Sequence, residues 1–443
     1  MNLSDSYHLK ELPDLSNATN LEELNLDSCE SLVEIPSSFS HLHKLYELWM
    51  SKCKNLQVIP VQMNLTSLKY VNMRGCSKMR NIPLMSTNII TLSMVEIGDV
   101  HPSFRLCSRL ANINLGNSGK LKGLTHLPKS VTYLDLSNSD IERIPDCIKA
   151  LHRLKYLFLY RCKRLTSLPE LPRSLVFLKA GDCESMKIVF STFNTPHAQL
   201  NFTNCFKLSQ QARRAIVQHS FLCAKNNYPE PSIYISGISL LPGGEVPAEF
   251  DHRAMGNTLT VVLDGNSRFV FCVVISPKQQ TTLDGLFPTL CCRCIGQSDL
   301  DPIDIVLSDC IDFQTKHLCT FLSGWLNIDP SKVSREKMLS DDFKEFCQPE
   351  VNREIMFEFS SEFDDFYIAE CGAKIWTQEE IIEGSYESES EQVFGDNIEL
   401  EPSEEAIVDD TEYNEATNID GEKHTGCWSW LFIYFDLLVS GRR

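Results

Sequence analysis

The sequence lacks the short motifs that mark common enzyme sites. Its 443 residues contain no G-x-x-x-x-G-K-S/T phosphate loop, no G-x-S-x-G nucleophile turn and no H-E-x-x-H helix. Cys291, Cys292 and Cys294 lack the paired C-x-x-C spacing of a structural zinc site. These absences argue against catalysis, and we expect neither a metal nor a cofactor.

Positive charge is scarce as well. The net charge is −18, yet residues 378–422 hold 17 Asp and Glu and no Lys or Arg, so removing them leaves −1. A nearly neutral remainder offers no broad basic surface, which argues against nucleic-acid binding. The acidic stretch is also poor in hydrophobic residues, so we predict a disordered tail over residues 378–424.

Hydrophobic runs long enough to cross a bilayer are missing. Residues 425–443 form a short C-terminal segment that is apolar from Trp428 to Val439, but it is too short and is interrupted by Asp436. We therefore expect no transmembrane span. The segment is predicted to dock on the protein or to touch a membrane interface.

What the first half does contain is a repeat with the pattern L-x-x-L-x-L. Its first positions recur at steps of 21 to 24 residues, which is the range of leucine-rich repeats. Stacked repeats bury the inward residues of each short strand, so residues 1–195 are predicted to form a solenoid with an exposed concave face. The eight copies are Leu21-Leu24-Leu26, Leu45-Leu48-Met50, Leu68-Val71-Met73, Ile89-Leu92-Met94, Leu110-Ile113-Leu115, Val131-Leu134-Leu136, Leu154-Leu157-Leu159 and Leu175-Leu178-Ala180.

Cysteines follow the same period. Cys29, Cys53, Cys76, Cys162 and Cys183 each stand three residues after the last position of a copy, where the repeat consensus takes Asn or Cys. We interpret them as small, buried, reduced residues of a turn. Free thiols in this number favour a reducing compartment inside the cell, and we expect the cytoplasm, with the nucleus as an alternative.

The first residues align with the middle of a repeat. Met1, Asn2 and Leu3 match Leu24, Asn25 and Leu26. We therefore expect an N-terminally truncated solenoid, either the C-terminal part of a longer receptor or a truncated gene model.

Beyond the solenoid the pattern changes. A connecting segment over residues 196–230 contains one amphipathic helix, predicted for residues 206–223, with His219 at the edge of its apolar face. Short β-rich runs separated by turns then predict an antiparallel β-sandwich over residues 231–377. The runs are residues 232–236, 258–263, 269–276, 290–296, 303–307, 317–326, 355–360 and 367–376.

Side chains that flank the buried pair of each repeat strand point into the concave face. Tyr156, Phe158 and Tyr160 make one strand aromatic at all three of these positions. Aromatic residues are frequent at binding hot spots. The alternative is that these rings pack against the predicted β-sandwich of residues 231–377, here called the β domain. The candidate partner-binding residues are Trp49, Tyr70, Arg74, Tyr133, Tyr156, Phe158, Tyr160, Phe177 and Lys179.

These features resemble one protein class. The repeats that close on Ile-Pro are similar to the leucine-rich region of plant intracellular immune receptors of the TIR–nucleotide-binding–LRR class. N-F-T-N-C-F-K-L at residues 201–208 resembles the motif that leaves its last repeat. The segments at 354–359 and 370–372 resemble closing strands of its post-LRR domain, a jelly-roll and immunoglobulin-like β-sandwich. A longer set of residues resembles the signature of that domain: Leu241, Pro242, Gly243, Gly244, Val246, Pro247, Phe250, His252, Arg253 and Gly256 through Val261.

The resemblance implies a recognition module. In this class the repeats and the post-LRR domain bind a pathogen effector, or a host protein modified by one, and keep the receptor inactive beforehand. The resemblance also implies contact with an upstream nucleotide-binding domain and oligomerisation on activation. NAD cleavage and nucleotide binding belong to upstream domains and are not expected of this chain. The alternatives are an extracellular LRR ectodomain and a β-sandwich hydrolase or lectin with attached repeats.

Overall fold

The structure is a computed structural model of the 443-residue chain. The predicted tail (378–424) and C-terminal segment (425–443) lie outside the described residues, as does the predicted strand at 232–236. The structure describes residues 1–376 except for gaps at 61–62, 64, 80–84, 95–101, 120, 122–123, 125–126, 190–194, 196–197, 226–238, 264–267, 279–288, 296–302, 308–312, 323–352 and 363–365.

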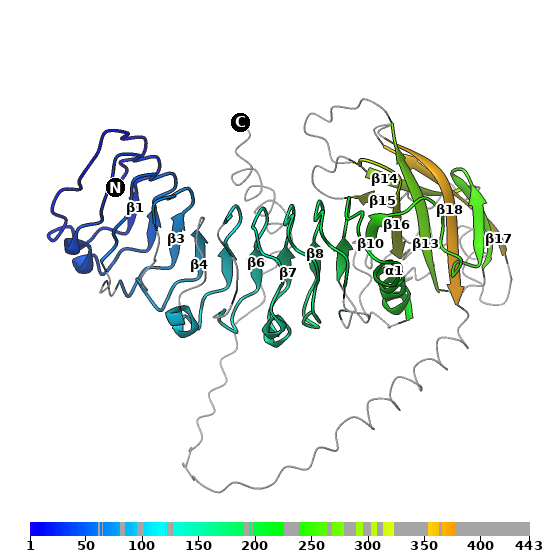
Figure 1. Cartoon of the computed structure of the whole chain (residues 1–443), viewed down its shortest axis with the longest axis horizontal. Coiled ribbons are helices and arrows are strands. Elements are labelled where there is room, and N and C mark those ends of the chain that lie inside the picture. The colour runs from blue at the N-terminus through cyan, green and yellow to red at the C-terminus, as the bar shows by residue number, and fades with distance from the viewer. Residues whose placement is uncertain are drawn as a thin grey trace, which may run out of the picture. The chain divides into compact units, whose positions relative to one another are not determined.

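The repeats form one parallel sheet, with one short strand per repeat (Figure 1). Neighbouring strands pair without offset, so Leu24 lies opposite Leu48 and Leu48 lies opposite Val71. These central residues are buried in a continuous core, which confirms the predicted solenoid. Its strands are β1 (Glu23–Asn25), β2 (Glu47–Trp49), β3 (Tyr70–Met73), β4 (Thr91–Met94), β5 (Asn112–Asn114), β6 (Tyr133–Asp135), β7 (Tyr156–Phe158), β8 (Phe177–Lys179) and β9 (Gln199–Asn201).

The predicted cysteine positions form a ladder through the solenoid. Each ladder thiol donates to a backbone carbonyl of the preceding repeat, for example Cys53 Sγ to Leu26 O at 3.2 Å and Cys183 Sγ to Leu159 O at 3.1 Å. Cys205 extends the ladder by one repeat, donating to Ala180 O at 3.0 Å. The five predicted ladder cysteines are buried free thiols, as expected.

Two repeats have serine at the ladder position. Ser139 Oγ lies 3.5 Å from Cys162 Sγ. Ser118 Oγ is buried and has no hydrogen-bond partner among the described residues. A buried hydroxyl without a partner costs free energy, because its hydrogen bonds to water are lost on folding.

We predict that Ser118→Cys stabilises the fold. Sulfur lies farther from Cβ than oxygen does and is less costly to bury unpaired, so the thiol should reach a carbonyl of the preceding repeat. The expected gain is about 1 kcal/mol in the free energy of unfolding, measured by urea denaturation. Ser139→Cys is the control and should gain less, since the Ser139 hydroxyl already has a partner. Equal or lower stability of Ser118→Cys would contradict this account.

A second group of strands follows the solenoid, and its first member continues the solenoid sheet. β10 pairs parallel with β9 and antiparallel with β16. The resulting 14-stranded sheet ends with the order β9-β10-β16-β13-β18-β11. A separate 4-stranded sheet has the order β12-β17-β14-β15. The bounds are β10 (Ser239–Pro242), β11 (His252–Met255), β12 (Thr258–Leu263), β13 (Arg268–Pro277), β14 (Thr289–Ile295), β15 (Ile303–Val306), β16 (His317–Leu322), β17 (Arg353–Ser361) and β18 (Phe366–Trp376).

The two sheets share one hydrophobic core. The ring of Phe271 on β13 lies 4.8 Å from that of Phe357 and 5.2 Å from that of Phe359, both on β17. Strands β12 to β18 match seven of the predicted runs to within four residues at each end. Strands β9, β10 and β11 were not predicted.

The signature residues lie around β10 and β11. Leu241 and Pro242 are buried in β10, whereas Gly244 and Arg253 are exposed. A Cβ on Gly243 would lie 2.5 Å from the Leu318 side chain, so a larger residue would clash there. Gly256 lies in the turn between β11 and β12 and has a φ of +87°, which favours glycine. Val246 is buried, and the Pro247 carbonyl accepts the Phe250 N–H at 3.1 Å.

Helix α1 (Gln210–Lys225) packs beside β10, β13 and β16 (Figure 1). It begins four residues later than predicted, because the Ser209 side chain accepts the Ala212 N–H at 3.1 Å and caps the helix there. The position expected for His219 was wrong. This residue is buried, and its Nε2 lies 2.8 Å from the Thr195 carbonyl.

A second buried histidine joins the solenoid to the following strands. His317 on β16 accepts the Asn204 backbone N–H at Nε2 over 3.0 Å, and its Nδ1–H donates to the Thr315 carbonyl at 2.8 Å. Asn204 also donates to Asp182 Oδ1 at 2.8 Å. This geometry requires neutral imidazole, and burial lowers the pKa of His317 to about 4.

We predict an acid-sensitive fold. The His317 pKa is about 4 when folded and 6.5 when unfolded, so the unfolded state binds more protons in that range. Stability is therefore lost as the pH falls from 6.5 towards 4, by about 3 kcal/mol from this residue. Burial also lowers the pKa of His219, which adds in the same direction.

His317→Gln should flatten the loss in this pH range, measured as the free energy of unfolding at several pH values. His43→Gln, at an exposed histidine, is the control and should keep the wild-type slope. An unchanged slope in His317→Gln would show that His317 does not titrate as described.

Candidate partner-binding face

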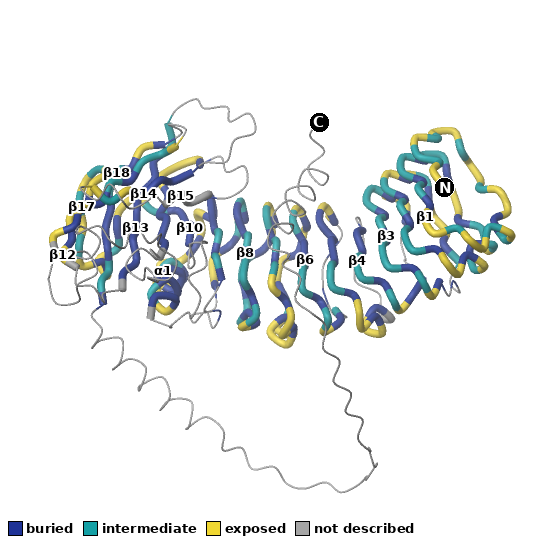
Figure 2. Tube along the Cα trace, turned by 180° about the vertical axis from the view of Figure 1, so that it is seen from behind, coloured by how far each residue is buried: buried dark blue, intermediate teal, exposed yellow. Residues whose placement is uncertain are grey.

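Side chains that flank the buried residues of β1–β9 form one continuous surface, here called the strand face. Successive residues of a strand point to opposite sides, so a buried central residue leaves its neighbours on this surface. All nine predicted binding residues lie on it and are half-buried: Trp49, Tyr70, Arg74, Tyr133, Tyr156, Phe158, Tyr160, Phe177 and Lys179. In Figure 2 the repeat strands combine buried and half-buried residues. The in-register pairing arranges them in rows across the repeats.

The structure brings five predicted rings together over β6–β8. Tyr133, Tyr156 and Phe177 are aligned across β6, β7 and β8. Tyr156 and Phe177 stack at 5.5 Å with a 10° angle between their planes, and Tyr133 lies 5.1 Å from Phe158. With Tyr160, these residues are here called the aromatic patch.

Cations lie over two rings of this patch. Lys179 Nζ is 5.2 Å from the centre of Phe158, and Arg161 Cζ is 4.9 Å from the centre of Tyr160. Arg161 also pairs with Asp182 at 3.4 Å. Burial raises the pKa of Tyr160 to about 12, so this phenol is neutral at physiological pH. The patch therefore presents apolar ring surface beside positive charge.

The β domain joins the solenoid on the far side of the patch's last strand. In strand order, β9 lies between β8 and β10. Tyr133, Tyr156 and Phe158 contact side chains of neighbouring repeats.

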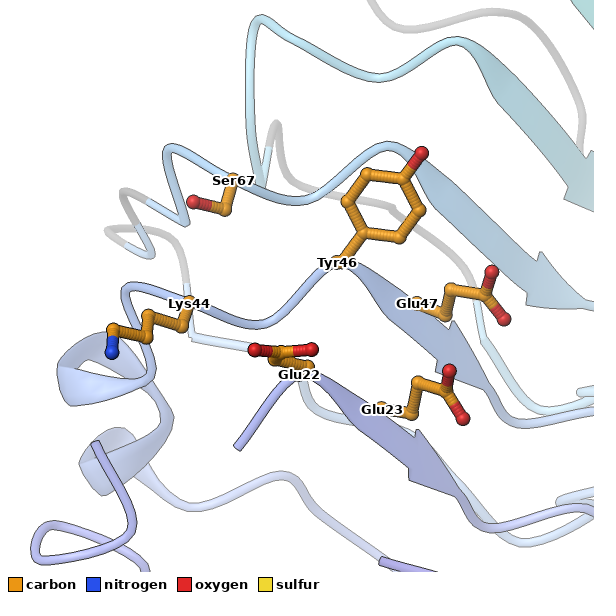
Figure 3. Close-up of a pocket in the computed structure, with 6 residues that line it drawn as sticks. All are labelled: Glu22, Glu23, Lys44, Tyr46, Glu47 and Ser67. Atoms are coloured by element: carbon orange, nitrogen blue, oxygen red, sulfur yellow. The ribbon is translucent and has the colours of Figure 1, made fainter. Parts of the chain in front are cut away.

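Trp49 and Tyr70 lie toward the other end of the face, near a hollow of about 460 Å³ (Figure 3). Trp49 Nε1 donates to Glu47 at 3.0 Å, and Tyr70 lies 5.3 Å from Tyr46. Sequence reasoning missed Tyr46, because it stands one residue before β2. The hollow is lined by Glu22, Glu23, Lys44, Tyr46, Glu47 and Ser67.

The residues aligned with Asn25, Trp49 and Asn72 across the strands are here called the middle row of the strand face. This row holds a second feature that was not predicted from the sequence. On five strands its residue is Asn or Asp, whose side-chain oxygen accepts the backbone N–H two residues later and closes an Asx turn. The donor–acceptor distances run from 2.9 to 3.2 Å. The five residues are Asn25, Asn72, Asn114, Asp135 and Asn201. The recurring Asn at one position of the repeat was the available signal.

Within the described part of the chain, no group of three His, Cys, Asp or Glu residues is placed to hold a metal ion. The helices of that part include none that is both long and apolar enough to cross a membrane.

Comparison with known proteins now places the chain. A family profile described as Leucine Rich Repeat matches residues 20–42. The Arabidopsis thaliana protein "Disease resistance protein RML1B" is 48% identical over 414 residues, covering 91% of this chain and 36% of that protein. "Disease resistance protein RML1A" is 41% identical over 392 residues, with 86% and 36% covered. "Disease resistance protein RPP5" is 30% identical over 317 residues, with 61% and 18% covered.

The chain is a homologue of plant disease resistance proteins. This confirms the resemblance drawn from the repeats and the downstream signature. The chain spans about a third of the length of the relatives RML1B and RML1A, so it corresponds to one part of such proteins.

Proposed function

We propose that this chain is the recognition part of a plant immune receptor. It binds a pathogen effector, or a host protein modified by one, through the strand face. The observation that supports this most is the aromatic patch over β6–β8, where five rings and two cations lie on a rigid set of paired strands. Binding, and not catalysis, is the activity we assign.

The physical case for the patch rests on its composition and its rigidity. Aromatic side chains bury a large area and lose little conformational entropy on binding. Their backbone is held by strand pairing, and Tyr160 packs against Gly181, where an added Cβ would lie 3.3 Å from the ring. A preordered surface of this kind avoids part of the entropic cost of association.

The remainder of the proposal extends the class resemblance. Residues 231–377 act as the post-LRR β-sandwich, a reading supported by the two sheets around the Phe271 core. The continuous pairing of β9 with β10 supports joint action of the solenoid and this domain in holding the receptor inactive. Contact with an upstream nucleotide-binding domain and oligomerisation on activation complete the scheme. We place the receptor in the cytoplasm, with the nucleus as an alternative.

Phe158→Ala tests the recognition surface. The ring is half-buried and lies on the strand face, so its removal should leave the melting temperature nearly unchanged. Affinity for the effector or host partner should fall by about 2 kcal/mol or more, the cost of a hot-spot residue. Proximity labelling in plant tissue identifies the partner, and calorimetry with the purified partner measures the affinity.

Ile188→Ala is the matched control. Ile188 is an apolar side chain of the solenoid that is 60% exposed, and it lies outside the strand face. It should leave both the melting temperature and the affinity unchanged. A large drop in melting temperature for Phe158→Ala with intact affinity would assign the ring to internal packing and reject the proposal.

A further inference from the structure

Asp135 differs from its equivalents along the middle row of the strand face. Its Oδ1 accepts the Ser137 N–H at 2.9 Å, the same Asx turn that Asn25, Asn72 and Asn114 make in their repeats. An amide oxygen is therefore sufficient for the turn. The negative charge of Asp135 has no role in this local structure that asparagine would not fill.

The charge is also costly where it stands. Asp135 is only 7% exposed, and burial raises the pKa of its carboxyl above the usual range, with hydrogen bonds from Ser137 acting in the opposite direction. The charges of Arg74 and Lys179 favour its ionised form and so lower its pKa, but burial has the larger effect. A buried carboxylate is destabilising unless cations or hydrogen bonds compensate its charge.

Two neighbouring strands and a glycine surround the carboxylate. Across the strands its neighbours are Asn114 on one side and Phe158 on the other. A Cβ on Gly116 would lie 3.3 Å from Asp135 Oδ2, so a side chain at this position would crowd that oxygen. The ring of Tyr133, two residues before Asp135 on the same strand, lies 5.1 Å from the ring of Phe158.

We propose that Asp135 is the anchor point for a lysine or arginine side chain of the protein that binds the strand face. The carboxylate pairs with the cationic head, and the rings of Tyr133 and Phe158 contact its alkyl stem and its charge. This inference rests on the proposed function, since it specifies the chemistry of the partner at that surface. It also accounts for a carboxylate where four other strands have asparagine.

The test uses the full chain and two tripeptide probes, acetyl-Gly-Arg-Gly-amide and the same peptide with citrulline, a neutral analogue of arginine. Saturation-transfer NMR gives the dissociation constants. We expect the arginine peptide to bind at least about five-fold more tightly than the citrulline peptide. Asp135→Asn should abolish this difference without lowering the melting temperature, because asparagine retains the turn.

Two further variants separate the site from nonspecific attraction. Gly116→Ala should weaken the arginine peptide while leaving the carboxylate in place, because its methyl group covers Oδ2. Asp27→Asn, at another carboxylate of the strand face, is the control and should retain the preference for arginine. Equal binding of the two peptides to the wild-type chain, or a preference that survives in Asp135→Asn, would overturn the proposal.

This test needs no identified effector, so its outcome is separable from that of the proposed function. Loss of effector affinity in Phe158→Ala together with no arginine preference would retain the recognition surface and reject the cation site. An arginine preference that depends on Asp135, together with intact effector affinity in Phe158→Ala, would retain the cation site and reject the recognition surface.

Discussion

The structure depends on the in-register pairing of one short strand with the next. No single repeat buries its own leucines, and each hydrophobic residue is covered only when the adjacent repeat stands directly beside it. Pairing such as that of Leu134 with Leu157 satisfies the backbone and closes the core together. Because the register does not slip, every position of the repeat becomes a straight row along the solenoid.

Each row then has its own chemistry. The central row is leucine-rich and buried. The ladder row holds cysteines, whose thiols donate to the preceding repeat, and two serines. The middle row of the strand face is mostly Asn or Asp, because a side-chain oxygen closes the turn that follows each strand. Phe158 and Lys179 break this row where the aromatic patch lies, and Asp135 adds a charge beside them. Trp49 and Ser93 break the same row elsewhere, so two of its four breaks lie in the surface assigned to recognition.

The solenoid was predictable because its information is periodic and local. The L-x-x-L-x-L copies locate β1 to β8, and the alternation of buried and exposed residues places Tyr156, Phe158 and Tyr160 on one face. The strands β12 to β18 were found for a similar reason, since they are apolar runs bounded by turn residues.

Features that depend on distant partners were not predictable in this way. Strand β10 contains a proline and is defined by pairing with β9 and β16, and β11 is short and polar. The helical periodicity predicts His219 at the edge of the apolar face. It is buried instead, and its ring lies within hydrogen-bond distance of the Thr195 carbonyl, which a sequence pattern does not reveal. The significance of Asp135 depended on knowing that Gly116, in the preceding repeat, lies beside its carboxylate.

The central claim is that the strand face over β6–β8 contacts the partner. Photo-cross-linking tests this directly, with benzoylphenylalanine placed in turn at Tyr156, at Ile188 and at Val262, an exposed residue of β12. The account predicts that the partner is captured through position 156 and through neither of the other two. Capture through position 262 or 188, with none through 156, would contradict it.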